Sequence, residues 1–272
     1  MPQVEPFLRW AGGKTWLKKH LNIVLGDFHF NNYFEPFLGG GAVFFALAPH
    51  NMSYLSDLNR ELIDTYVAIK QSPQNVIDIL ERYKNTESFY YSIRAQQPQS
   101  YPEAAARFIY LNQTSFNGLY RVNRMGEYNV PYGYRNKKFL EKDKLLQVSQ
   151  CLQNTLLSCG DFETLREQIG DGDLVFLDPP YTVSHNNNGF IKYNQKLFSL
   201  EDQKRLSKFI DYIKEQGAYY ILSNAAHQTI NDIFLKENDM RYEFTRASLI
   251  GGNKAVRGKI SEYIFTNIQE VR

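Results

Sequence analysis

The residues best suited to chemistry stand at the end of an apolar run late in the chain. The sequence DLVFLDPPY at 173–181 predicts a buried strand followed by Asp178, Pro179, Pro180 and Tyr181. In an open α/β sheet, ligands bind at the carboxyl ends of strands, so this turn is expected to face a site. The two prolines fix φ and prevent the strand from continuing, which would hold a carboxylate, a carbonyl and an aromatic ring in one rigid turn. The alternative is a Pro-Pro turn that only ends the strand.

A second candidate site is the glycine-rich turn in the sequence FEPFLGGG. It predicts a strand, a turn where Gly39, Gly40 and Gly41 let the backbone approach a ligand closely, and then an apolar helix. Asp57 is expected at the tip of the next strand, near the ~20-residue offset at which dinucleotide-binding folds place an acid for ribose hydroxyls. Packing of the helix against the strand is the alternative use of such glycines.

Two further segments carry an aromatic ring beside a charge. WAGGKT at 10–15 lacks the first glycine of a phosphate-binding P-loop, so an ATPase site is rejected. Trp10 and Lys14 remain, either as ligand contacts or as a core tryptophan and a surface lysine. LLSCGDFETL predicts a strand that ends before Asp161 and Phe162, which suit the edge and face of an adenine. Asp161 could equally cap a helix beginning at Phe162.

The elements that must position these residues alternate in type. Short β-branched or aromatic runs between amphipathic stretches indicate an α/β sheet with crossover helices. Seven strands are predicted, at 33–37, 52–56, 156–159, 173–178, 218–224, 241–248 and 262–267. The gap between the second and third strands is too long for a crossover and must hold extra structure. Within it the sequence predicts helices at 59–70, 73–84, 87–95 and 102–114, and a β-hairpin at 117–133.

Composition limits the class of protein. The 272 residues are 43% hydrophobic and 22% charged, which is typical of a globular chain with one large domain or one domain carrying an insertion. The N-terminus has no apolar run of signal-peptide length, and no segment reaches the ~18 apolar residues of a membrane span, so a cytoplasmic protein without a membrane partner is expected. Two cysteines without a CxxC pair and five scattered histidines predict that no metal is bound.

The net charge of +2 names no partner, but local charge favours nucleic acid. Segment 121–144 has seven cations against three acids, and segment 246–259 has four cations and no acid. Such runs suggest phosphate contacts, although a charge run is more often a solvated face. Aromatic and amide side chains interleave the first run and favour DNA: Tyr120, Asn123, Tyr128 and Asn129.

In chain order, these segments resemble the Dam family of S-adenosyl-L-methionine-dependent DNA adenine methyltransferases, whose turn is of the DPPY class. The resemblance rests on FLRWAGGK (7–14), FEPFLGGG (34–41), DLN (57–59), GDF (160–162), DPPY (178–181) and FNGLYRVNRMGEYNVPYG (116–133), across nearly the whole chain. It implies an α/β fold, with a seven-stranded Rossmann-like methyltransferase sheet and an inserted helical target-recognition domain that carries a β-hairpin. Residues 1–56 and 156–272 would form the catalytic domain, and 57–155 the DNA-binding insertion.

The same resemblance implies S-adenosyl-L-methionine as the cofactor. The residues that would line its site are Trp10, Lys14, Glu35, Pro36, Phe37, Gly39, Gly41, Asp57, Asp161, Phe162 and Asp178.

The DPPY residues suit methyl transfer to adenine on chemical grounds. Adenine's exocyclic amine is a poor nucleophile because its lone pair is delocalised into the ring. If Asp178 and the Pro179 carbonyl accept its hydrogen bonds, they favour a pyramidal nitrogen ready for direct transfer without a covalent intermediate. The base must flip out of the duplex, and Tyr181 is available to stack on it. Methylation of a cytosine carbon would need a thiolate, typically after proline, and neither Cys151 nor Cys159 follows one. An RNA substrate, a protein amide substrate and a non-catalytic DNA-binding module are the alternatives.

The target in double-stranded DNA is expected to be GATC. Arg121 can make the bidentate contact that selects guanine, and Leu119 and Pro131 suit a thymine methyl group. Resemblance to the family assigns Phe116 and Asn117 to the gap left by the flipped base, and Arg9 to a second guanine-reading position where the family often has lysine. Asn123 completes the expected DNA-binding residues. Tyr120 and Met125 match no base, and a related GAT-containing site is the alternative. The enzyme would belong to a restriction-modification system, act alone or be phage-borne.

Overall fold

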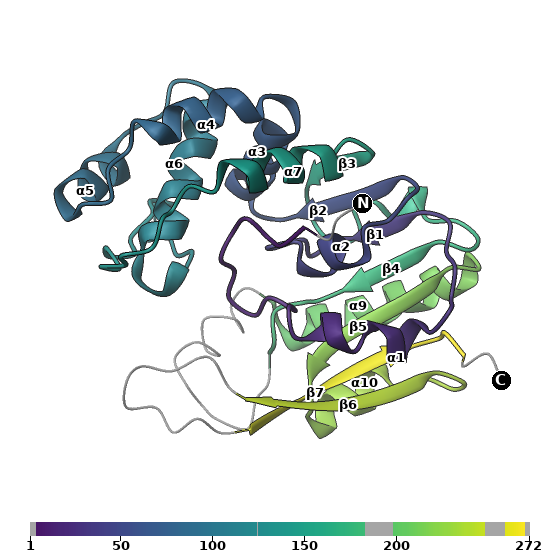
Figure 1. Ribbon diagram of the computed structural model, residues 1–272. Helices are drawn as coiled ribbons and strands as arrows, with labels where there is room; N and C mark the ends of the chain where they lie inside the picture. Colours follow the sequence, from purple (N-terminus) through teal and green to yellow (C-terminus); the bar gives the residue numbers. More distant parts are fainter. Residues whose placement is uncertain (1–3, 124, 183–197, 248–258, 270–272) are drawn as a thin grey trace. The chain divides into compact units, whose positions relative to one another are not determined.

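The computed structural model describes residues 4–123, 125–182, 198–247 and 259–269. Its strands are β1 (Tyr33–Glu35), β2 (Ser53–Asp57), β3 (Thr155–Cys159), β4 (Leu174–Leu177), β5 (Tyr219–Ala225), β6 (Met240–Ala247) and β7 (Lys259–Thr266). They form one seven-stranded sheet in the order β3-β2-β1-β4-β5-β7-β6 (Figure 1). Each of the seven strands predicted from the sequence is present, so the expected Rossmann-like methyltransferase fold is confirmed.

The chain divides into two compact units. The first comprises Met1–Lys18 and Leu38–Phe162, and the second comprises Lys19–Phe37 and Glu163–Arg272. The first unit therefore holds β2, β3, the glycine-rich turn and the helices between those two strands. The second holds the other five strands and the DPPY turn, which is residues 178–181.

The first unit combines a parallel strand pair with a helical bundle. β2 and β3 run parallel, with Asp57 opposite Cys159. The helices of this unit are α2 (Ala42–Leu47), α3 (Arg60–Gln71), α4 (Pro73–Glu81), α5 (Glu87–Ala95), α6 (Tyr101–Thr114) and α7 (Lys142–Cys151), with a 3-10 turn η2 (Phe116–Gly118). Helix α6 packs against α3, α4 and α5 (Figure 1). The four helices expected in the long gap are thus confirmed, with ends shifted by a few residues.

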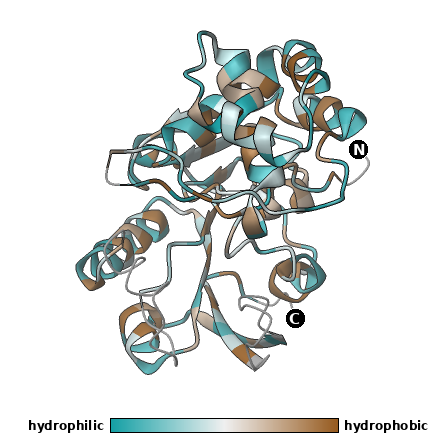
Figure 2. Cartoon of the chain, turned by 90° about the vertical axis from the view of Figure 1, so that its left-hand side faces the viewer, coloured by the Kyte–Doolittle hydropathy of each residue, from teal (hydrophilic) through white to brown (hydrophobic). Residues whose placement is uncertain are grey.

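Local chemistry sets the ends of these helices. The Asn59 side chain accepts a hydrogen bond from the N–H of Leu62 at the start of α3, and Thr86 and Ser100 cap α5 and α6 in the same way. The helices carry hydrophobic and hydrophilic residues on different faces (Figure 2). Their apolar faces bury side chains such as Tyr66 and Ile69 of α3.

The second unit is built on a fully buried central strand. All four residues of β4 are buried, as expected of a strand covered on both faces. β1 and β5 flank it in parallel, and β7 runs antiparallel between β5 and β6. The helices of this unit are α1 (Leu21–Leu25), η3 (Arg166–Gln168), α9 (Leu200–Glu215) and α10 (Gln228–Phe234), and η1 (Leu17–Lys19) spans the boundary between the units in the sequence. The strand expected at 33–37 ends at Glu35 because Pro36 has no N–H to donate to a neighbouring strand.

Candidate active site

The DPPY turn follows β4 directly. Leu177 of β4 pairs with Leu222 of β5, so Asp178 and Ser223 are the next residues along two parallel strands. The hydroxyl of Ser223, a fully buried residue, donates a 2.6 Å hydrogen bond to Asp178 Oδ1. This bond restricts rotation of the carboxylate, so Asp178 is oriented by the adjacent strand.

Buried amides hold the second half of the turn. Gln203 of α9 is fully buried and donates through Nε2 to the Thr182 hydroxyl at 2.6 Å and to the Pro180 carbonyl at 3.4 Å. Its Oε1 in turn accepts from Asn224 Nδ2 at 3.1 Å. The backbone after the two prolines is therefore tied to both α9 and β5.

Tyr181 ends the turn in a buried polar contact. Its hydroxyl donates to Glu262 Oε2 on β7, and Glu262 Oε1 accepts from Arg246 of β6. Burial, followed by the charges of Glu262 and Asp178, raises the pKa of Tyr181 well above its usual value. The phenol thus stays protonated and acts as the donor at neutral pH.

Strand β1 and the two residues after it also lie in the second unit. Glu35 is buried, and its Oε2 accepts a 2.8 Å hydrogen bond from the Tyr33 hydroxyl. Burial, then the charge of Glu35, raises the pKa of Tyr33 well above its usual value. Pro36 is buried, and the Phe37 ring packs edge-on against Phe198, with 5.7 Å between centroids.

In the first unit, Asp57 clamps the glycine-rich turn to the end of β2. Its Oδ2 accepts a hydrogen bond from Gly39 N at 2.9 Å, and its Oδ1 accepts from Asn59 N at 2.9 Å. Burial raises the pKa of Asp57, and these backbone hydrogen bonds oppose that rise. Gly39 and Gly41 have φ of +48° and +65°, a region that favours glycine.

Trp10 explains why Gly39 has no side chain. A Cβ at Gly39 would lie 2.7 Å from Trp10 Cδ1, so the indole packs directly on the turn. The Trp10 ring also stacks on the Tyr120 ring, with 5.8 Å between the ring centroids. Tyr120, which matched no base in the sequence, also donates a 2.8 Å hydrogen bond to Glu61. Lys14 is 3% exposed and donates to the Gly12 carbonyl at 2.8 Å, so it is not the solvated lysine of the alternative interpretation.

Asp161 and Phe162 follow β3, beside the end of β2. Gly160 N donates to the Asp57 carbonyl at 3.1 Å, which places this segment next to Asp57. Phe162 is buried and Asp161 is partly exposed. No α-helix begins at Phe162 in this described segment, which forms turns up to η3, so the helix-cap alternative for Asp161 is wrong.

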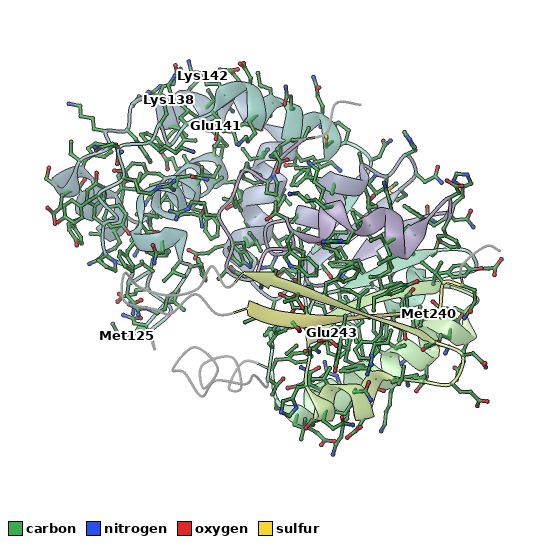
Figure 3. All side chains as sticks on the ribbon, turned by 60° about the horizontal axis from the view of Figure 1, so that its bottom comes forward. Met125, Lys138, Glu141, Lys142, Met240 and Glu243 are labelled. Atoms are coloured by element: carbon green, nitrogen blue, oxygen red, sulfur yellow. The ribbon has the colours of Figure 1, made fainter. Side chains whose placement is uncertain are left out.

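The hairpin predicted in the insertion is present. Asn123 N donates to Glu127 O at 2.8 Å and Asn129 N donates to Arg121 O at 3.1 Å, with exposed Met125 at the tip (Figure 3). The Asn123 side chain closes the turn, because its Oδ1 accepts from the backbone N–H groups of Met125 and Glu127. Arg121 is exposed, and its Nε donates to Asn129 Oδ1 at 2.7 Å. Asn129 therefore orients the Arg121 guanidinium.

A second group of predicted DNA-binding residues gathers where the N-terminal segment meets η2. Asn112 of α6 binds both backbone groups of Arg9, accepting from its N–H at 2.8 Å and donating to its carbonyl at 2.7 Å. The Arg9 side chain lies against Gly118, where a Cβ would come within 2.5 Å of Cζ. Phe116 is 50% exposed and Asn117 has a φ of +55°. Phe116 N donates to the carbonyl of exposed Pro131 at 2.9 Å, while Leu119 is partly exposed.

Three further sequence expectations concern a metal ion, a membrane span and the second basic segment. Among the described residues, no three His, Cys, Asp or Glu side chains gather so as to hold a metal ion. Within the same described ranges, no helix has the length and apolar character needed to cross a bilayer. The second basic segment, 246–259, lies mostly outside the described residues, and its Arg246 pairs with Glu262.

Each unit thus brings predicted site residues together. Three residues that bind them were not foreseen: Ser223 and Glu262 in the second unit, and Asn112 in the first. Ser223 carried a visible signal, because a polar Ser-Asn pair ends an apolar strand. Glu262 carried a weaker one, an acid between Ile260 and Ile264 on one face of a strand. Asn112 lies within an ordinary helical pattern and carried none.

The sheet order and the DPPY turn at the end of β4 define a Rossmann-like methyltransferase. The sequence model of the D12 class N6 adenine-specific DNA methyltransferases matches residues 10–247. The chain belongs to this family, and its activity is N6 methylation of adenine in DNA.

Relatives are similar along most of their length. The chain is 36% identical over 275 residues to the type II methyltransferase M1.LlaDCHI of Lactococcus lactis subsp. cremoris, covering 97% of this chain and 95% of the relative. It is 36% identical to the type II methyltransferase M.MjaIII of Methanocaldococcus jannaschii, covering 82% and 85%. It is 30% identical to a DNA adenine methylase of Haemophilus influenzae, covering 96% and 92%. These names include restriction-modification-type enzymes and Dam-type methylases alike.

Proposed function

We propose that the methyl donor is S-adenosyl-L-methionine. When bound, this cofactor supplies a methyl group on a positively charged sulfur. In the first unit, the proposed cofactor-binding residues are Trp10, Lys14, Gly39, Gly41, Asp57, Asp161 and Phe162. In the second unit, they are Glu35, Pro36, Phe37 and Asp178.

The hydrogen-bonding groups at Asp57 and Asp161 suit a nucleoside. An ionised carboxylate offers about four acceptor positions, so the backbone hydrogen bonds from Gly39, Leu58 and Asn59 leave capacity for a ribose hydroxyl. Those bonds also hold the carboxylate rigidly, which lowers the entropic cost of binding. Asp161, beside Asp57 at the end of β3, suits the amino edge of an adenine, and the indole of Trp10 is partly exposed.

The DPPY turn is proposed to bind and activate the target amine. The observation that carries this proposal is the 2.6 Å bond from Ser223 to Asp178 Oδ1, because it orients an acceptor at a sheet edge. Asp178 and the Pro179 carbonyl accept hydrogen bonds from the amine and direct its lone pair away from the ring plane. Tyr181 stacks on the flipped base.

The proposed target is GATC, read by the insertion 57–155, while 1–56 and 156–272 form the catalytic domain. Support comes from the Arg121–Asn129 contact, because a pre-oriented guanidinium is suited to a bidentate bond with guanine. Leu119, Asn123 and Pro131 are the other hairpin contacts. In the second group, Phe116 and Asn117 would fill the gap left by the flipped base, and Arg9 would be a second guanine-reading residue.

Two experiments test these proposals. Incubation with S-adenosyl-L-methionine labelled on its methyl group and with duplex DNA should place label on adenine N6, and absence of transfer from this donor would reject it. Sequencing of modified bases in DNA from methylation-free cells that express the protein should show N6-methyladenine at GATC. Complete methylation of another motif with GATC left bare would overturn the proposed target.

A further inference from the structure

Glu262 is a buried acid in the second unit to which the proposed chemistry gives no role. It lies on β7, is 1% exposed, and stands opposite Phe244 of β6 in the antiparallel ladder. A carboxylate is rarely buried unless charge and hydrogen bonds compensate it. Glu262 receives both, since Arg246 binds Oε1 and the Tyr181 hydroxyl binds Oε2.

The two oxygens of Glu262 connect different parts of the unit. Arg246 comes from the edge strand β6, whereas Tyr181 ends the DPPY turn after β4. Arg246 supplies the opposite charge that keeps the carboxylate in place. Because the Glu262 carboxylate is held in place, the Tyr181 hydroxyl has a fixed acceptor. A hydrogen bond from this hydroxyl, at the para position of the ring, restricts tilting of the whole ring.

Ring orientation matters for a stacking group more than for a packing group. A tyrosine that only fills space tolerates tilting, whereas a ring that supports a base must present its face at one angle. The backbone on either side is already rigid, because Pro179 and Pro180 precede the ring and Gln203 binds the Pro180 carbonyl. The remaining freedom is side-chain rotation, which the hydrogen bond to Glu262 restricts.

We propose that Glu262, held by Arg246, is a positioning residue that fixes the ring of Tyr181 in the orientation needed to stack on the target adenine. This inference rests on the proposed stacking role of Tyr181. Glu262 touches neither base nor cofactor in this account, so its effect on the reaction passes entirely through Tyr181.

The kinetic test is a double-mutant cycle on Tyr181→Phe and Glu262→Gln. Tyr181→Phe removes the hydrogen bond, and Glu262→Gln replaces its charged acceptor with a neutral amide. Both keep a similar volume, so each should lower the single-turnover methylation rate about 10-fold. The apparent affinity for S-adenosyl-L-methionine should stay within twofold. The double variant should be no slower than Tyr181→Phe, because the lost contact is the same.

Glu243→Gln is the matched control for the change in charge. Glu243 lies on the neighbouring strand β6, is exposed, and carries the same functional group (Figure 3). It should methylate like the unsubstituted protein. Glu262→Asp gives a second variant in case Glu262→Gln folds poorly, because it keeps the charge for Arg246 but retracts the carboxylate by one methylene. It should slow the reaction in the same way.

A fluorine measurement tests the contact without relying on activity. In protein labelled with 3-fluorotyrosine, the Tyr181 resonance is identified by its loss in Tyr181→Phe. Glu262→Gln should shift that resonance or merge its ring-flip forms, and Glu243→Gln should leave it unchanged. An unaltered Tyr181 resonance in Glu262→Gln, or multiplicative rate losses in the double variant, would overturn the inference.

The outcomes separate this inference from the proposed function. If the unsubstituted protein methylates adenine and Glu262→Gln matches Glu243→Gln in rate, only the positioning role fails. If Tyr181→Phe and replacement of Tyr181 by alanine both leave the rate unchanged, the stacking role fails and takes the inference with it. In that case the fluorine measurement reports only whether Glu262 contacts the Tyr181 ring, and not a role in methylation.

Discussion

Replacing Ser223 by alanine tests whether the orientation of Asp178 governs methyl transfer. Ser223 is 0% exposed and its hydroxyl donates a 2.6 Å hydrogen bond to Asp178 Oδ1. Alanine removes one oxygen and leaves the strand, its neighbours and Asp178 itself in place. The carboxylate then loses the partner on β5 that restricts its rotation.

The size of the effect follows from the kind of bond. A hydrogen bond to a charged acceptor contributes about 1.5 to 3 kcal/mol, which corresponds to roughly 10- to 150-fold in rate if all of it serves the transition state. Part of it also stabilises the folded ground state, so a fall of about 10- to 50-fold in the single-turnover rate is expected. Affinity for the cofactor should change little.

Ser56 offers a matched control in the same sheet. It is also 0% exposed, it lies on β2, and within the described part of the chain its hydroxyl has no hydrogen-bond partner. Ser56→Ala should therefore keep the full rate and leave the free energy of unfolding equal or slightly higher, by up to about 1 kcal/mol. Rapid-quench measurement of both variants is the assay. If Ser223→Ala methylates within twofold of Ser56→Ala, the argument that Ser223 orients Asp178 is wrong.

Three further substitutions test the remaining roles. Asp178→Ala should lower the single-turnover rate at least ~100-fold, the scale for one electrostatic group at a transition state, and a rate within a few-fold of the original would reject its assignment. Asp57→Ala should weaken S-adenosyl-L-methionine binding by ~1.5 to 3 kcal/mol while DNA affinity without cofactor stays the same, and calorimetry with unchanged cofactor affinity would contradict this. Arg121→Ala should relax discrimination at one base pair by ~1 to 3 kcal/mol across single-base variants of GATC, whereas a contact to phosphate alone predicts uniformly weaker binding.

The sequence alone was sufficient to predict the seven strands and four of the helices in the long gap, but not α7. Apolar runs such as DLVFLD and their turn residues are local features, and local features set strand and helix positions. The acid at the tip of β2, the glycines before α2 and the rigid DPPY turn were visible for the same reason. Each lies at or after the carboxyl end of a strand, which is where open α/β sheets bind ligands.

The contacts that orient those residues were decided only by the tertiary structure. Tyr181 meets Glu262 across 81 positions, Ser223 meets Asp178 across 45, and Asn112 meets Arg9 across 103. Such contacts depend on which strands are neighbours and on their register, and a shift of one residue would turn each side chain to the other face. The insertion of the antiparallel β7 between β5 and β6 puts Glu262 within reach of Tyr181. Local sequence preference contains no information on that order, because the order minimises the free energy of the whole sheet rather than of any one segment.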